Sequence, residues 1–165
     1  MINLKYIFSY YLLSVALISC AQSKGVVKNI YATYREVLPG NIAVDPNGHE
    51  MASRDTINFV YVETSSSDIK WKMAWKNNKA FSIEASLVNT NPFDAGIDNV
   101  NNKKIMIRVA PGNKLWQLQL MPLEENLPSP KALSHDIILL KYSNNGKIIW
   151  QKIADQRQIN SIPSQ

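Results

Sequence analysis

Residues 69–87 read IKWKMAWKNNKAFSIEASL, and this stretch decides the fold class of the chain. Apolar residues alternate with polar ones on both sides of Asn77-Asn78, with lysines in the gaps of the first half and Ser or Glu in the gaps of the second. A period of two is the repeat of a β-strand. The stretch therefore predicts an antiparallel hairpin with one apolar and one solvated face.

The register of this hairpin depends on the length of its loop. A two-residue loop, Asn77-Asn78, would set Trp75 opposite Ala80, whereas a loop one residue longer sets Trp75 opposite Phe81. We favour the longer loop because its cross-strand pairs are apolar and stabilise by about 0.2–1 kcal/mol each. The other expected pairs are Met73 with Ile83, Trp71 with Ala85 and Ile69 with Leu87.

Asn145-Gly146 is the strongest turn signal in the chain, because both residues tolerate positive φ. It predicts a second hairpin over 137–153, with Tyr142 opposite Ile149 and Ile138 opposite Ile153. Further strands are expected at 30–37, 56–63, 105–109 and 115–121, between turns rich in Pro, Gly and Asn.

Several short strands without an amphipathic helix predict an all-β fold. We expect a single β-sandwich domain over 26–155, immunoglobulin-like or of related topology, with a small β-barrel as the alternative. The last ten residues, 156–165, are expected to form a polar tail.

Cys20 is the only cysteine in the chain. It follows Lys5, an apolar stretch over 6–18 and the small residue Ser19, which is the order of a secretion signal. The segment Leu17-Ile18-Ser19-Cys20 resembles the lipobox of bacterial lipoprotein precursors, in which the cysteine receives a diacylglycerol, the chain is cut before it and the new amine is acylated. The resemblance implies a signal peptide at 1–19, a lipidated Cys20 and a tether over 20–25.

A lipid on Cys20 implies an exported protein held in a membrane of the cell envelope, and we expect the outer membrane. The alternative is ordinary secretion with a cut before Gln22, because Ser19 and Ala21 also suit a general signal peptidase. The product would then be a soluble secreted or periplasmic protein. In either case the mature chain has no possible intramolecular disulfide, so a packed core must stabilise it.

The charge of the chain is mildly basic, at +5 from 18 basic and 13 acidic residues. The basic residues are scattered singly, and an exported protein rarely meets nucleic acid. We therefore expect no nucleic-acid partner; an envelope protein or a glycan is the expected partner besides the membrane.

Residues that could carry chemistry are few. His49 and His135 are the only histidines, no cysteine follows Cys20, and Gly-rich phosphate loops, HExxH and CxxC motifs are missing. His135 and Asp136 are neighbours that would point to opposite faces of a strand, so they are not expected to orient one another. Two distant histidines make no zinc signature. We expect no catalytic residues, no cofactor and no metal site.

Two surfaces are candidates for binding. The loop 89–103 is longer than usual connections, and such loops on rigid scaffolds often carry recognition. Its candidate residues are Asn91, Pro92, Phe93, Asp94 and Asp98. The stretch Asn91-Pro92-Phe93-Asp94-Ala95-Gly96 is similar to the Asn-Pro-x-x-Gly loop of chagasin-type inhibitors of cysteine proteases, which are also small β-sandwiches.

The second candidate is an aromatic and basic surface formed by Trp150, Lys141 and Lys152, whereas Trp71 and Trp75 are expected in the core. The leading hypothesis is a non-catalytic, lipid-anchored binding or accessory module of the cell envelope. The alternatives are a secreted protease inhibitor that uses the loop 91–101 and a glycan-binding module that uses tryptophan.

Overall fold

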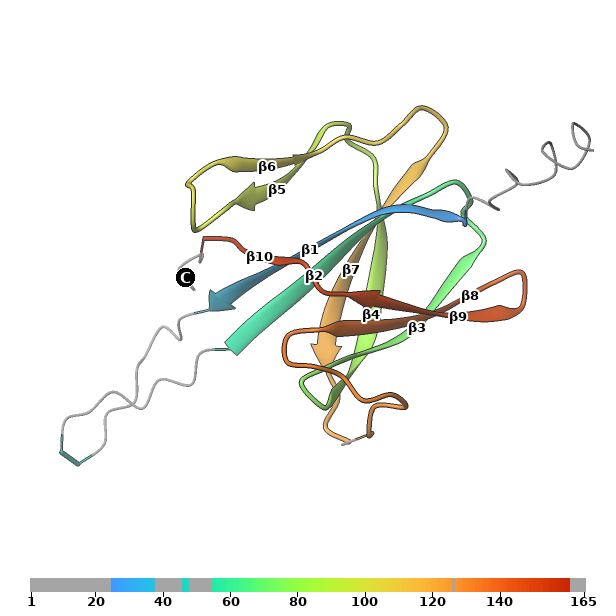
Figure 1. The fold of residues 1–165 in the computed structure, drawn as a ribbon. Coiled ribbons are helices and arrows are strands. Elements are labelled where there is room, and N and C mark those ends of the chain that lie inside the picture. Colours follow the sequence, from blue (N-terminus) through green and yellow to red (C-terminus); the bar gives the residue numbers. More distant parts are fainter. Residues whose placement is uncertain (1–24, 38–45, 48–54, 126, 161–165) are drawn as a thin grey trace, which may run out of the picture.

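The computed structural model describes residues 25–37, 46–47, 55–125 and 127–160 (Figure 1). The regular secondary structure of these residues consists of strands alone, as the sequence predicts. The strands are numbered β1 to β10 along the chain. They are β1 (Val27–Val37), β2 (Asp55–Thr64), β3 (Ile69–Lys76), β4 (Lys79–Val88), β5 (Phe93–Ile97), β6 (Lys104–Ile107), β7 (Lys114–Pro122), β8 (Ile138–Asn144), β9 (Lys147–Ile153) and β10 (Gln156–Gln158).

Eight strands form one mixed sheet in the order β10-β1-β2-β7-β4-β3-β8-β9. Neighbouring strands are antiparallel except for β1 and β10, which pair in parallel. The sheet curls, so that β8 and β9 lie across from β1 and β2 (Figure 1). The chain is therefore all-β, with a sheet folded on itself in the manner of a sandwich or barrel.

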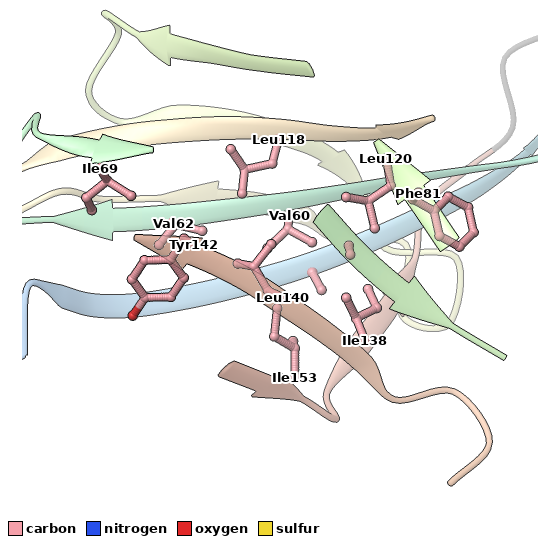
Figure 2. Close-up of a cluster of buried hydrophobic side chains, with 12 residues drawn as sticks. Val60, Val62, Ile69, Phe81, Leu118, Leu120, Ile138, Leu140, Tyr142 and Ile153 are labelled. Atoms are coloured by element: carbon pink, nitrogen blue, oxygen red, sulfur yellow. The ribbon is translucent and has the colours of Figure 1, made fainter. Parts of the chain in front are cut away.

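The curl encloses the main core, to which seven strands contribute side chains (Figure 2). Each apolar side chain that is fully buried here stabilises the fold by about 1.5–3 kcal/mol. The buried members are Ala32, Val60, Val62, Ile69, Ala74, Phe81, Leu118, Leu120, Ile138, Leu140, Tyr142 and Ile153. Trp71 packs against this core, as the sequence predicts.

The hairpin β3–β4 has a two-residue turn, so the longer loop predicted from the sequence is wrong. Trp75 lies opposite Ala80, not opposite Phe81. Asn77 and Asn78 both adopt positive φ, of 49° and 61°. Two successive positive φ angles are the conformation of a type I′ turn, which matches the twist of a hairpin.

The two-residue turn is compatible with burial because both faces of this hairpin are covered at the positions next to the turn. Ala74 and Phe81 enter the main core, whereas Trp75 and Ala80 enter a second cluster on the outside of the sheet. After three pairs the strands separate, β3 toward β8 and β4 toward β7. The other predicted pairs, Met73 with Ile83, Trp71 with Ala85 and Ile69 with Leu87, therefore do not form.

The hairpin β8–β9 has the predicted register. Tyr142 lies opposite Ile149 and Ile138 opposite Ile153. Asn145 and Gly146 form its turn with positive φ at both positions. This prediction is confirmed because the turn sequence alone selects the loop length.

A separate two-stranded sheet, β5–β6, covers the outer face of β2 (Figure 1). Ala95 and Ile107 pack there with Phe59 and Tyr61. The segment 89–103 was expected to be a loop, and that expectation is wrong for its centre, because β5 lies inside it.

The segment predicted as a polar tail begins with a strand, β10, so the tail prediction is wrong at 156–158. Ile159, just beyond it, is buried and forms an isolated bridge with Asp98, the residue that follows β5. Residues 161–165 lie outside the described part of the chain.

Candidate functional site

The two ends of the curled sheet meet along a line that we call the seam. On one side lies β1, and on the other lie β9 and β10, which are separated only by Ala154 and Asp155. The chain thus passes directly from one end strand of the sheet to the other. How closely β1 approaches β9–β10 differs along the seam.

One end of the seam, which we call the sealed end, is closed by backbone pairing. Ala32 lies beside Gln156 and Tyr34 beside Gln158, and the amide of Ile159 donates to the carbonyl of Tyr34 at 2.9 Å. The buried ammonium of Lys76 reinforces this end.

Lys76 reaches the sealed end from the last position of β3. Its Nζ donates to Asn58 Oδ1 at 2.9 Å and to Gln156 Oε1 at 2.8 Å, and it lies 5.0 Å from the centre of the Tyr34 ring. Burial lowers the pKa of Lys76, while the nearby Asp136 raises it by a smaller amount. Sequence analysis assigned this lysine to a solvated face, and that assignment is wrong for Lys76 because the curl of the sheet brings Asn58 of β2 and Gln156 of β10 over it.

The other end of the seam, which we call the open end, holds a groove of about 720 Å³. No ladder joins β1 to β9 there, and the parallel pairing with β10 begins only at Ala32. The groove is lined by residues 25–30 on one side and by Tyr142, Asn144, Ile149 and 151–155 on the other.

The floor of the groove is apolar. Ile153 and Tyr142 are buried members of the main core (Figure 2). Ile30 and Ile149 pack against this core. Burial also raises the pKa of Tyr142. The side-chain oxygen of Asn144 is buried and has no hydrogen-bond partner among the described residues.

A buried carboxylate of β2 holds β1 against β2 at the open end. Glu63 of β2 accepts hydrogen bonds from Asn29 Nδ2 at 2.5 Å, Asn113 Nδ2 at 2.6 Å and the amide of Ala110 at 3.0 Å. Burial raises the pKa of this carboxyl, but the three hydrogen bonds and nearby Lys28 lower it by more, so the pKa lies below its ordinary value. Asn29, at the open end, is thus tied to β2.

The predicted aromatic and basic surface is present on the outer face of β8 and β9. Lys141 lies opposite Trp150, and its Nζ is 5.0 Å from the centre of the indole ring. Lys131 approaches the same ring at 5.8 Å, and Trp75 packs beside it with ring centres 5.6 Å apart. Lys152 lies two residues beyond Trp150 in the strand, where it is exposed and lines the groove.

The predicted binding loop is engaged in internal contacts at four of its five candidate residues. Asn91 exchanges hydrogen bonds with the backbone of Val109, at 3.0 and 3.1 Å, and precedes a cis peptide bond to Pro92. The Phe93 ring packs on Tyr61 with centres 5.3 Å apart.

The two aspartates of this loop have different surroundings. Asp98 is buried and accepts hydrogen bonds from the amides of Val100 and Asn101. Asp94 is exposed, accepts a hydrogen bond from the amide of Gly96 and pairs with Lys104 at 3.3 Å. These contacts lower the pKa of Asp94. Both carboxylates therefore help to shape the β5–β6 layer.

His135 and Asp136 contact each other, contrary to the sequence expectation. His135 Nδ1 lies 2.6 Å from Asp136 Oδ2. The expectation assumed a strand, but Asp136 lies in a turn with positive φ, where neighbouring side chains can meet. Both side chains are exposed, and the hydrogen bond with His135 is the main reason that the pKa of Asp136 is lowered.

Other predicted features lie outside the described residues, namely the signal peptide, Cys20 with its lipobox, and His49. Within 25–37, 46–47, 55–125 and 127–160, no group of three or more His, Cys, Asp or Glu is placed to hold a metal ion. In the same ranges, no helix is long and apolar enough to cross a membrane.

Sequence reasoning missed the groove. One wall lies at 25–30 and the other at 142–155, far apart in the chain, and only the order of the strands brings them together. The one local signal was the Asn145-Gly146 turn, which fixes the orientation of β9. Comparisons of the chain with known protein families, curated proteins and solved structures found no match.

Proposed function

We propose that this chain is an exported lipoprotein of the bacterial cell envelope, anchored through a lipid on Cys20, which acts as a non-catalytic binding module. The observation that carries the anchor is the lipobox-like segment Leu17-Ile18-Ser19-Cys20, and the groove is the feature that supports a binding role. Gly25, in its wall, follows Cys20 by five residues. An extended chain spans at most about 3.6 Å per residue, so a lipid on Cys20 would hold the groove within about 18 Å of the membrane.

The arrangement of polar groups supports binding over catalysis. The buried ammonium of Lys76 already donates to Asn58 and Gln156. His135 and Asp136 form an exposed pair at the surface. A groove with an apolar floor and strand-edge walls offers shape and backbone hydrogen bonds, which suit a binding partner.

The test is the intact mass of the mature protein extracted from its native membrane, beside a Cys20→Ser variant. We expect a chain that starts at Cys20 and carries acyl chains, and a variant that has lost both the added mass and the membrane attachment. A lipid-free chain that starts at Gln22 would contradict the anchor.

A second candidate function is the binding of an acidic glycan at Trp150. The observation that favours it is the pair of ammonium groups, from Lys131 and Lys141, held within 6 Å of one indole ring. Such a site joins a flat apolar surface to positive charge. Polygalacturonate should change the tryptophan fluorescence, dextran should not, and Trp150→Ala should abolish the change; equal responses to both polymers would contradict this function.

The structure gives less support to an inhibitor that uses the loop 91–101. Asn91 and Phe93 are committed to contacts with Val109 and Tyr61. Gly96 also stands one residue later than in the Asn-Pro-x-x-Gly pattern. We therefore do not propose protease inhibition through this loop.

A further inference from the structure

We propose that the open end of the seam receives one extended peptide strand from another protein of the envelope, which runs antiparallel to both β1 and β9. The proposal rests on the proposed function, because it names the partner class of that binding module. It depends on three properties of the groove: the direction of its walls, their free backbone groups, and the chemistry of its lining.

The first property is that β1 and β9 run in the same direction. Six antiparallel steps lead from β1 through β2, β7, β4, β3 and β8 to β9. A strand laid between two parallel strands can be antiparallel to both of them. It then forms two antiparallel ladders, the more stable kind of pairing.

The second property is a free backbone edge on each wall. In a hairpin closed by a two-residue turn, the pair next to the turn, Asn144 and Lys147, is the hydrogen-bonded kind, and the two kinds then alternate along the ladder. The backbone groups of Trp150 and Lys152 consequently face away from β8. As β9 ends the sheet, no strand of the described residues pairs with them. The side chain of Gln151 donates to the carbonyl of Lys152 at 3.1 Å, so the amide of Lys152 is the backbone group of this residue that a peptide would use.

On the opposite wall the same alternation applies. The carbonyl of Tyr34 points toward β10, because it accepts a hydrogen bond from Ile159. Counting back in steps of two places the backbone groups of Ala32 and Ile30 on the same side. Ala32 is paired with β10, whereas Ile30 faces the groove, where no other described strand pairs with it.

The third property is the chemistry of the lining, which specifies the peptide. Apolar side chains at alternate positions would rest on Ile30, Ile149 and Ile153 of the floor. The charged groups at the groove are Lys28 and Lys152 against the single carboxylate of Asp155, so acidic side chains are favoured in the peptide.

The volume of the groove fits a short strand. A strand residue occupies about 160 Å³, from a rise of about 3.4 Å, a strand spacing of about 4.8 Å and a sheet spacing of about 10 Å. The groove of about 720 Å³ therefore holds about four or five residues. Exposed strand edges of this kind are recurrent sites for peptide docking, in which backbone hydrogen bonds supply the affinity.

The test uses the mature full-length protein and a fluorescein-labelled peptide, Glu-Val-Thr-Val-Thr-Val-Glu, whose binding is followed by fluorescence anisotropy. The control peptide carries an N-methyl group on its central valine. We expect Lys152→Pro to weaken binding about tenfold, because proline removes one outward amide. Lys152→Ala, which keeps the amide and removes the charge, should weaken it less than Lys152→Pro.

Thermal unfolding would show that both variants keep the fold, since an outward amide at a sheet edge takes no part in the ladder with β8. No binding of the peptide, equal binding of the N-methylated peptide, or equal losses in the two variants would overturn the proposal. So would a concentration-dependent dimer that excludes the peptide, because the occupant would then be a second copy of this chain. The mass measurement on Cys20 decides the anchor independently of these outcomes.

Discussion

The sealed and open ends of the seam are built from the same two segments of chain, yet they differ in what joins them. At the sealed end, β1 pairs with β10 and Lys76 bridges Asn58 and Gln156. At the open end, the hydrogen bond between Asn29 and Glu63 instead holds β1 to β2, and a groove separates β1 from β9.

The difference shows that a curled sheet can be closed along only part of its length. Hydrogen bonds at one end fix the two walls of the seam, and the core beneath holds them at the other end without a ladder. Unpaired strand edges usually invite uncontrolled association. Here the two free edges face one groove, which limits what can reach them.

The largest expected effect comes from the core that both ends share. Ile153 is buried at the last position of β9, so Ile153→Ala should lower the free energy of unfolding by about 2–5 kcal/mol. Ile148, on the same strand, has 59% of its surface exposed, and Ile148→Ala should change stability by less than about 0.5 kcal/mol. Urea denaturation measures both. Equal losses would mean that the groove floor is not part of the core.

The next effect should appear at the open end. Glu63→Gln should cost about 1–3 kcal/mol at pH 7, because donors from Asn29, Asn113 and Ala110 lose a charged acceptor. Hydrogen exchange should become faster over 27–31 than over 32–34. Faster exchange at the sealed end alone would contradict the role given to this carboxylate.

The pH dependence follows from the lowered pKa of Glu63. Between its ordinary value of 4.5 and the lowered value, the unfolded chain binds more protons than the folded one. The contribution of Glu63 is therefore fully present above pH 4.5 and is lost as the pH falls through the lowered pKa. Glu63→Gln should lose less stability than the native chain on acidification, and parallel pH profiles would contradict this.

The smallest effect is expected at the sealed end. Lys76→Met should cost about 1 kcal/mol, because the loss of two hydrogen bonds is partly offset by removing a buried charge. Lys72→Met, at an exposed position of the same strand, is the matched control and should be neutral. Exchange at 156–158 should accelerate only in Lys76→Met, and an unchanged rate there would show that Lys76 does not support β10.

A structural feature could be predicted from the sequence where neighbouring residues determine it. Asn145-Gly146 determines its own turn, so the register of β8–β9 and the contact of Lys141 with Trp150 followed from it. The β3–β4 register did not follow, because its faces are covered by segments distant in the sequence.

Two further features had no local cause. Gln156-Arg157-Gln158 is polar throughout and becomes a strand only because β1 offers it an edge. The groove exists because β1 and β9 are brought together by six intervening strand pairings. The periodicity of the sequence predicts neither the strand β10 nor the groove.

The most direct test of the partly open seam is a disulfide trap in a Cys20→Ser background. If the parallel register of Ala32 with Gln156 continued, Lys28 would lie beside Lys152, close enough for a disulfide. We predict that Lys28→Cys with Lys152→Cys stays reduced under mild oxidation, whereas Thr33→Cys with Arg157→Cys, a pair within the ladder, forms a cross-link. Equally fast cross-linking of both pairs would mean that the seam is sealed throughout, and would contradict the account.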